Sequence, residues 1–148
     1  MCPRDAAHSR LRAAAHRWAG DDVCEIPAER PTFLWLYGST MIEARAERDG
    51  SIELRAFLVL GPETTGSLEE QLRLFSAPVG RLEVDEDGDV ALVHRVPPRA
   101  AEERVLAAIR DVSCLADRLD EELCQRFGGI RSVDRFQHDV LAALGGQN

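Results

Sequence analysis

Residues 41–58, MIEARAERDGSIELRAFL, contain two runs in which nearly every second residue is apolar, one on each side of the pair Asp49-Gly50. An alternation of period two is typical of a strand that buries one face and exposes the other. Asp-Gly between two such runs is a strong signal of a β-hairpin, because the tight turn needs residues that accept a positive φ. The stretch therefore predicts two antiparallel strands joined by a tight turn.

The same signal recurs further along the chain, where Asp87-Gly88 joins residues 80–84 to residues 89–96. Ahead of both hairpins, residues 33–37 (FLWLY) are aromatic or aliphatic throughout. A continuous apolar run of this length predicts a central strand buried on both faces. Together these segments predict an antiparallel sheet of about five strands.

Helical periodicity surrounds these strands. Residues 5–19 and 101–127 carry apolar side chains at spacings of three and four, which predicts two amphipathic helices. A capping box, Ser67-x-x-Glu70, predicts the start of a middle helix that ends before Pro78. The order α-β-β-β-α-β-β-α predicts an α+β fold, with helices flanking one face of the sheet and the other face open to water or to a second subunit.

We expect residues 1–129 to form this domain. Residues 130–148 are expected to add a C-terminal helical extension of the same domain, and its tail after residue 145 is expected to fray. The apolar side chains of that extension recur at helical spacings, namely Val133, Phe136, Val140, Leu141 and Leu144.

Composition limits the classes of function. The chain has 148 residues, with 26 acidic side chains against 18 arginines and no lysine, and a net charge of −8. This balance argues against nucleic-acid binding, whose usual footprint is a basic patch. No apolar run is long enough to cross a bilayer, and the first residues lack the unbroken apolar core of a signal peptide. We therefore expect a single-domain cytoplasmic protein whose four cysteines are free thiols.

No motif for catalysis, a cofactor or a metal is found. Residues 85–89 (DEDGD) are similar to the start of a calcium loop, but the sixth and twelfth positions are Val90 and Val96 instead of Gly and Glu. His94 is the best single candidate for acid/base chemistry, although a lone histidine on a strand is usually a surface or cross-strand residue. We expect a non-enzymatic protein with no metal and no cofactor.

Residues 68–127 resemble a known superfamily. The resemblance lies in the strand GRLEVD at 80–85, the Asp-Gly turn, the apolar strand VALVHR at 90–95, the pair Pro97-Pro98 and a long helix containing Ala116-Asp117. This pattern and the element order resemble the YbjN and type III secretion chaperone-like superfamily, including its actinobacterial branches.

That resemblance implies a small, non-enzymatic protein that is usually a dimer and binds another polypeptide. It also implies that the dimer forms through the middle helix and its neighbouring strand, with the candidate residues Leu68, Leu72, Phe75, Val90 and Leu92.

Our leading hypothesis is a chaperone-like or regulatory domain, acting as a homodimer, that holds a partner polypeptide on apolar sheet and helix surface. The candidate contact residues are Leu11, Trp18, Phe33 and Trp35. The aromatic residues also suit a plain core role. Two alternatives stay open: a scaffold module for one folded partner, and a small-molecule sensor or enzyme with a polar pocket around His94 or Cys24.

Overall fold

The computed structural model describes residues 2–27, 29–63, 68–75 and 77–135. Its elements follow in this order: α1 (Pro3–Ala19), the short 3-10 helix η1 (Gly20–Asp22), β1 (Cys24–Ile26), β2 (Thr32–Tyr37), β3 (Thr40–Ala46), β4 (Ile52–Val59), α2 (Leu68–Leu72), β5 (Arg81–Val84), β6 (Val90–Val96) and α3 (Glu102–Phe127). The α+β class predicted from the sequence is confirmed.

The strands form a single antiparallel sheet of six strands in the order β1-β2-β3-β4-β6-β5. Both Asp-Gly hairpins are present, as β3–β4 and β5–β6. The sheet has one strand more than expected because residues 24–26, in the segment after α1, pair with β2 as an edge strand.

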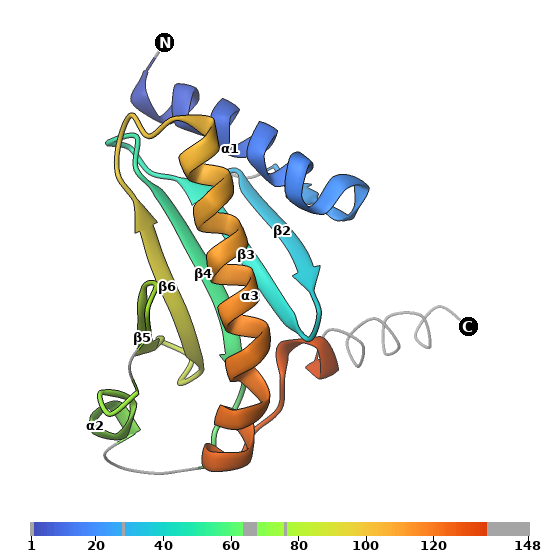
Figure 1. Cartoon of the computed structure of the whole chain (residues 1–148), viewed down its shortest axis with the longest axis vertical. Coiled ribbons are helices and arrows are strands. Elements are labelled where there is room, and N and C mark those ends of the chain that lie inside the picture. Colours follow the sequence, from blue (N-terminus) through green and yellow to red (C-terminus); the bar gives the residue numbers. More distant parts are fainter. Residues whose placement is uncertain (1, 28, 64–67, 76, 136–148) are drawn as a thin grey trace.

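Two helices cover one face of this sheet. α1 packs on β2 and β3, and α3 packs mainly on β4 and β6, so that both helices cross the same face (Figure 1). α2 lies by the C-terminal end of α3, where the rings of Phe75 and Phe127 meet edge to edge with centroids 6.1 Å apart. Within the described ranges, no helix crosses the opposite face of the sheet, which we call the uncovered face.

The hydrophobic core lies between the helices and the sheet. The alternation read from residues 41–58 places Ile42, Ala44, Leu54 and Ala56 on the covered face, and each is 0% exposed. Helix α3 contributes Val105, Ile109, Val112, Ala116 and Leu123. The stripe of α1 predicted from the sequence is buried at Leu11, Ala14 and Ala15. The apolar faces predicted for the strands and for the helices therefore pack together in one core.

A polar contact fixes the β2–β3 turn on α3. The backbone N–H of Ser39 donates to Asp117 Oδ1 at 2.9 Å. The hydroxyls of Ser39 and Thr40 donate to Asp120 Oδ2, and Asp120 is fully buried. Gly38 precedes this contact with φ +59°, and its backbone faces the Asp117 carboxylate so closely that a β-carbon there would overlap Oδ1. The turn therefore requires glycine at position 38.

The end of α2 differs from the sequence expectation. α2 ends at Leu72 rather than just before Pro78, because Phe75 N and Leu74 N donate to Leu72 O and Gln71 O in tighter turns. The predicted cap at Ser67 lies outside the described residues, as does the part of the C-terminal extension from residue 136 onward. Of the helices that the structure describes, none is both long and apolar enough to span a bilayer.

Candidate partner-binding surface

The predicted contact residues are mostly inside the protein. Leu11 and Phe33 are 0% exposed and Trp35 is 2% exposed, so these three side chains offer no surface to a partner. Trp18 is half-buried and packs on Tyr37, with ring centroids 5.3 Å apart. The prediction is corrected for Leu11, Phe33 and Trp35, whose side chains lie between the helices and the sheet and form part of the core.

Some of the predicted dimer contacts are buried in the core and others are partly accessible. Val90 and Leu92 are 0% exposed, because the side chains of β6 that alternate toward α3 fill the core, and Leu72 of α2 is 3% exposed. Leu68 and Phe75 are half-buried and pack against its edge. The prediction is therefore corrected for Leu72, Val90 and Leu92.

The uncovered face carries the other half of the FLWLY run. Leu34 and Leu36 are partly exposed, because successive side chains of a strand point to opposite faces. Leu36 pairs with Met41, and Met41 pairs with Phe57 on β4. Leu34, Leu36, Met41 and Phe57 are all half-buried, and we call this row the apolar strip. The sequence predicted a strand buried on both faces, but β2 is buried on one face only.

A pocket opens along the apolar strip. Its volume is 430 Å³, and the residues that line it include Asp22, Cys24, Leu34, Leu36 and Met41. A space of this size holds one or two side chains of a peptide. Sequence reasoning missed Leu36 and Met41, although the even positions of a strand whose odd positions are core residues are the signal that identifies them.

The edge strand β1 borders this pocket. All three of its residues are exposed, and it pairs only with β2. Glu25 anchors the strand to α1, with its Oε1 2.8 Å from an Arg12 Nη and 3.2 Å from His8 Nε2. The outer backbone edge of β1 has no strand beside it in the described residues, and such an edge is a template for another strand.

Several charged side chains beside the apolar strip on the uncovered face pair with one another. Arg45 lies 3.1 Å from Glu53 and 3.3 Å from Glu47, and Arg55 lies 3.1 Å from Glu83. Burial by itself lowers the pKa of Arg45, but the neighbouring glutamates outweigh it and the net shift of that pKa is upward. Because these charges are already compensated, the apolar strip is the part of the face that gains most from a partner.

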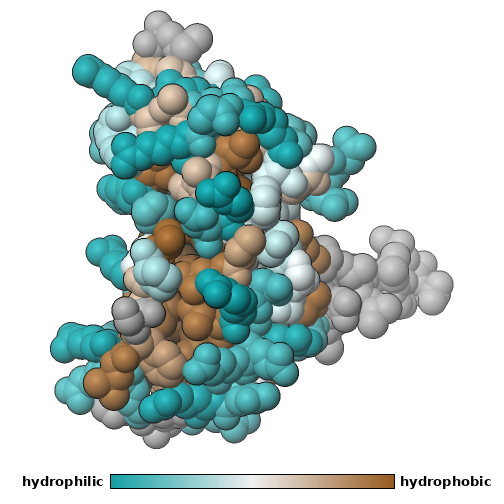
Figure 2. Space-filling model, in the orientation of Figure 1, coloured by the Kyte–Doolittle hydropathy of each residue, from teal (hydrophilic) through white to brown (hydrophobic). Residues whose placement is uncertain are grey.

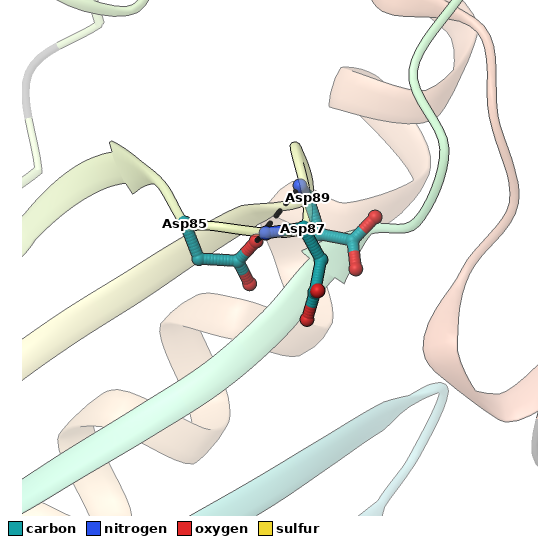
Figure 3. A group of neighbouring side chains, drawn as sticks. All are labelled: Asp85, Asp87 and Asp89. Atoms are coloured by element: carbon teal, nitrogen blue, oxygen red, sulfur yellow. Dashed lines mark hydrogen bonds between the residues drawn. The ribbon is translucent and has the colours of Figure 1, made fainter.

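The acidic turn at 85–89 is explained by its own hydrogen bonds. Asp85 Oδ1 accepts from the backbone N–H groups of Asp87 and Asp89 at 2.9 and 3.0 Å, as the dashed lines in Figure 3 mark. Asp89 Oδ1 accepts from Gly61 N at 2.8 Å. Ligand atoms of all three aspartates lie within 4.8 Å of one another, but two of the carboxylates already hold turns and loops in place.

His94 lies at the rim of a second pocket, of 520 Å³, together with Glu53, Arg81 and Arg95. Burial, assisted by the nearby charge of Arg104, lowers the pKa of His94, and Asp111 opposes this shift. In the described part of the chain, no hydrogen bond joins His94 to an acid or a nucleophile.

The four cysteines differ in accessibility. Cys2 and Cys24 are exposed, whereas Cys124 Sγ lies 3.6 Å from Leu58 O and burial raises its pKa to about 11. At pH 7.5 less than about one in a thousand of the Cys124 side chains is then thiolate, the reactive form.

We expect an aromatic disulfide reagent to label Cys2 and Cys24 within minutes and Cys124 only after unfolding in denaturant. Mass spectrometry of labelled peptides checks this. Labelling of Cys124 as fast as Cys24 in the folded protein would contradict the placement of Cys124 under β4.

Comparison with known protein families, and with curated proteins, finds no match for this chain.

Proposed function

We propose that this protein is a non-enzymatic binding domain that holds an extended segment of a partner polypeptide on its uncovered face, beside β1. The observation that carries the proposal is the position of an apolar strip and its pocket next to an unpaired strand edge. The resemblance of the element order to secretion chaperone-like domains supports the same proposal.

The edge of β1 supplies the backbone part of this recognition. An extended segment laid beside Cys24–Ile26 can exchange main-chain hydrogen bonds with the strand, which gives affinity that does not depend on sequence. Its alternate side chains would point toward the sheet face that carries the pocket. Main-chain pairing and one or two anchoring side chains together define a class of ligand: extended segments with an apolar anchor.

The apolar strip supplies the hydrophobic part of the binding free energy. Removing a leucine- or phenylalanine-sized side chain from water stabilises a complex by about 1.5–3 kcal/mol. Leu34, Leu36 and Met41 are half-buried before binding, so contact with a partner would also complete their own burial. Two such anchors supply at most about 6 kcal/mol, whereas micromolar binding requires about 8 kcal/mol. Main-chain pairing with β1 must therefore supply the remainder, and a segment that is already extended binds best, since ordering a flexible peptide opposes association.

The test uses a labelled extended peptide library on the purified chain, read by fluorescence anisotropy. Leu36→Glu places a charge in the pocket and is expected to weaken binding of the best peptide at least about tenfold. Gln125→Glu adds the same charge on the exposed side of α3 and is expected to leave binding unchanged.

Cys24 provides an independent readout, since it lines the pocket and is exposed. In a Cys2→Ser background, a bound peptide is expected to slow the labelling of Cys24. Equal weakening by both glutamate variants, or unchanged labelling of Cys24 under saturating peptide, would count against the uncovered face as the site. Binding of one folded protein but of no peptide would favour the scaffold alternative.

A second apolar surface lies on the face that carries the helices. Figure 2 shows hydrophobic side chains gathered beside α3, over β6 and toward α2. Its residues include the half-buried Phe75, Leu82 and Val84, and Leu74 is 78% exposed. We propose that a second copy of the chain covers this surface. The dimer contact would then lie near α2, as in the prediction from the sequence, but would use β5 in place of Val90 and Leu92.

Light scattering after size-exclusion chromatography tests this dimer. Leu74→Glu changes a side chain with little role in the core, and we expect it to shift the population from dimer to monomer. A wild-type chain that stays monomeric at the highest attainable concentration would contradict the proposed second copy.

A further inference from the structure

One end of the molecule has a pocket of 470 Å³ built from three separate segments. They are the start of α1, the β3–β4 turn and the turn between β6 and α3, and they contribute Pro3, Arg10, Gly50 and Arg99. Gly50 packs its backbone on Pro3, since a β-carbon at Gly50 would lie 3.1 Å from Pro3 Cβ. This contact holds two of the three walls together.

Arg10 supplies one positive charge to this pocket. Its Nε is buried and has no hydrogen-bond partner in the described structure. A buried donor left without an acceptor is costly, because it has lost its hydration without replacement. Arg10 therefore keeps hydrogen-bonding capacity that no group of the described chain uses.

Arg99 supplies the second charge from an unfavourable backbone position. Its φ is +67°, and among the described residues it is the one non-glycine residue with a positive φ. Ala100 N donates to Pro97 O at 3.3 Å, so Pro98 and Arg99 occupy the centre of a turn whose third position favours glycine. Strained positions of this kind concentrate where a side chain has a task.

Neither guanidinium is neutralised within the described structure. Arg12, Arg17 and Arg45 form ion pairs, whereas no ion pair joins Arg10 or Arg99 to an acid. Asp49 also borders the pocket, but its Oδ1 accepts from Ser51 N and Ser51 Oγ at 2.9 and 2.6 Å. Two arginines that form no ion pair therefore share one cavity with the Asp49 carboxylate, in a chain whose net charge is −8. The hydrogen bonds from Ser51 lower the pKa of Asp49 and keep it ionised, so the pocket carries a net positive charge from its two guanidinium groups and one carboxylate.

We infer that this pocket binds a phosphate group, held between the guanidinium groups of Arg10 and Arg99. Arginine presents a planar set of donors that matches phosphate oxygens. A phosphate monoester carries close to two negative charges at neutral pH, which matches two guanidinium groups. The site does not involve the apolar strip, and so it stands or fails independently of the proposed peptide binding.

The test is thermal unfolding of the full chain with increasing inorganic phosphate, against sodium chloride at matched ionic strength. A ligand that binds only the folded state raises the melting temperature with its concentration. We expect phosphate to raise the melting temperature of the wild type and broadening of the phosphorus NMR line to report the same binding. A parallel titration uses O-phosphoserine. A larger rise in melting temperature with O-phosphoserine than with inorganic phosphate identifies a phosphate monoester as the ligand, and a larger rise with inorganic phosphate identifies free phosphate.

Arg99→Gly separates binding from folding. Glycine suits a positive φ, so this variant is expected to melt a few degrees higher than the wild type without phosphate, and yet to lose the response to phosphate. Arg10→Gln is expected to weaken phosphate binding at least about tenfold. Arg118→Gln, an exposed position on α3, is expected to keep the full response.

Two results would overturn the site. One is a wild type that responds to phosphate no more than to chloride. The other is an Arg99→Gly variant that retains the wild-type response, which would place any bound phosphate elsewhere.

Discussion

Replacing Trp35 by alanine is expected to destabilise the protein by about 3–5 kcal/mol, the usual cost of emptying the space of a large buried aromatic side chain. Trp35 is 2% exposed and lies between the sheet and the helices. Replacing its neighbour Leu34 by alanine is expected to cost no more than about 1 kcal/mol, because Leu34 points to the uncovered face and stays partly in water. Two adjacent apolar residues of one strand should thus differ severalfold in their effect on stability.

Urea denaturation followed by circular dichroism measures both free energies of unfolding. Leu34→Ala should also weaken peptide binding by removing part of the pocket wall, while the folded protein remains. The two-faced description of β2 would be wrong if both variants lost similar stability, since that would mean that Leu34 is covered as completely as Trp35.

The parts of the fold that were predictable are those in which one pattern had one interpretation. Alternation in residues 41–58 and the Asp49-Gly50 pair predicted β3, its turn and β4, and the observed register places Ala44 opposite Leu54 and Ala46 opposite Ile52. A strand with one apolar face can pair in only one register without exposing that face. The long helix was equally well defined, because its apolar stripe persists from Val105 to Leu123.

The candidate site was not predictable in the same way. A run such as FLWLY has no polar residue to show which face is covered. Its composition is equally compatible with a strand that is buried on both faces and with a strand whose second face is apolar but open. The distinction depends on how many layers the fold builds, and α1 and α3 both pack on the same side of the sheet. Residues chosen for their aromatic character, Phe33 and Trp35, were therefore core residues, and the smaller Leu36 and Met41 were the exposed ones.

Three features that depart from the usual rules of local propensity and polar pairing lie in the proposed sites. A stable sequence normally satisfies local propensity, patterning and polar pairing together, and departures are expected where function competes. Here the departures are a half-exposed apolar strip, an arginine at φ +67° and a buried arginine Nε without an acceptor. Each would be simple to remove by substitution, which makes each a direct test of whether the protein uses it.

Replacing Gly38 by alanine is expected to cost about 2–4 kcal/mol, the sum of backbone strain and the loss of a hydrogen bond to a carboxylate. Gly38 has φ +59°, and a β-carbon there would overlap Asp117 Oδ1, the atom that accepts from Ser39 N at 2.9 Å. Gly20→Ala is the matched control: Gly20 also has φ +59°, but nothing lies within 4 Å of its β-carbon position. That variant should therefore show backbone strain without the overlap, about 1–3 kcal/mol.

A double-mutant cycle separates the overlap from the strain. Asp117→Ala removes the obstructing carboxylate and its hydrogen bonds to Ser39, at an expected cost of about 1.5–3 kcal/mol. With that carboxylate gone, Gly38→Ala should cost only as much as Gly20→Ala, so the double variant is expected to lose at least about 1 kcal/mol less than the sum of the single variants. Additive losses would mean that the β2–β3 turn is not held against α3 through Asp117, and the anchoring of the strand that carries the apolar strip would need another explanation.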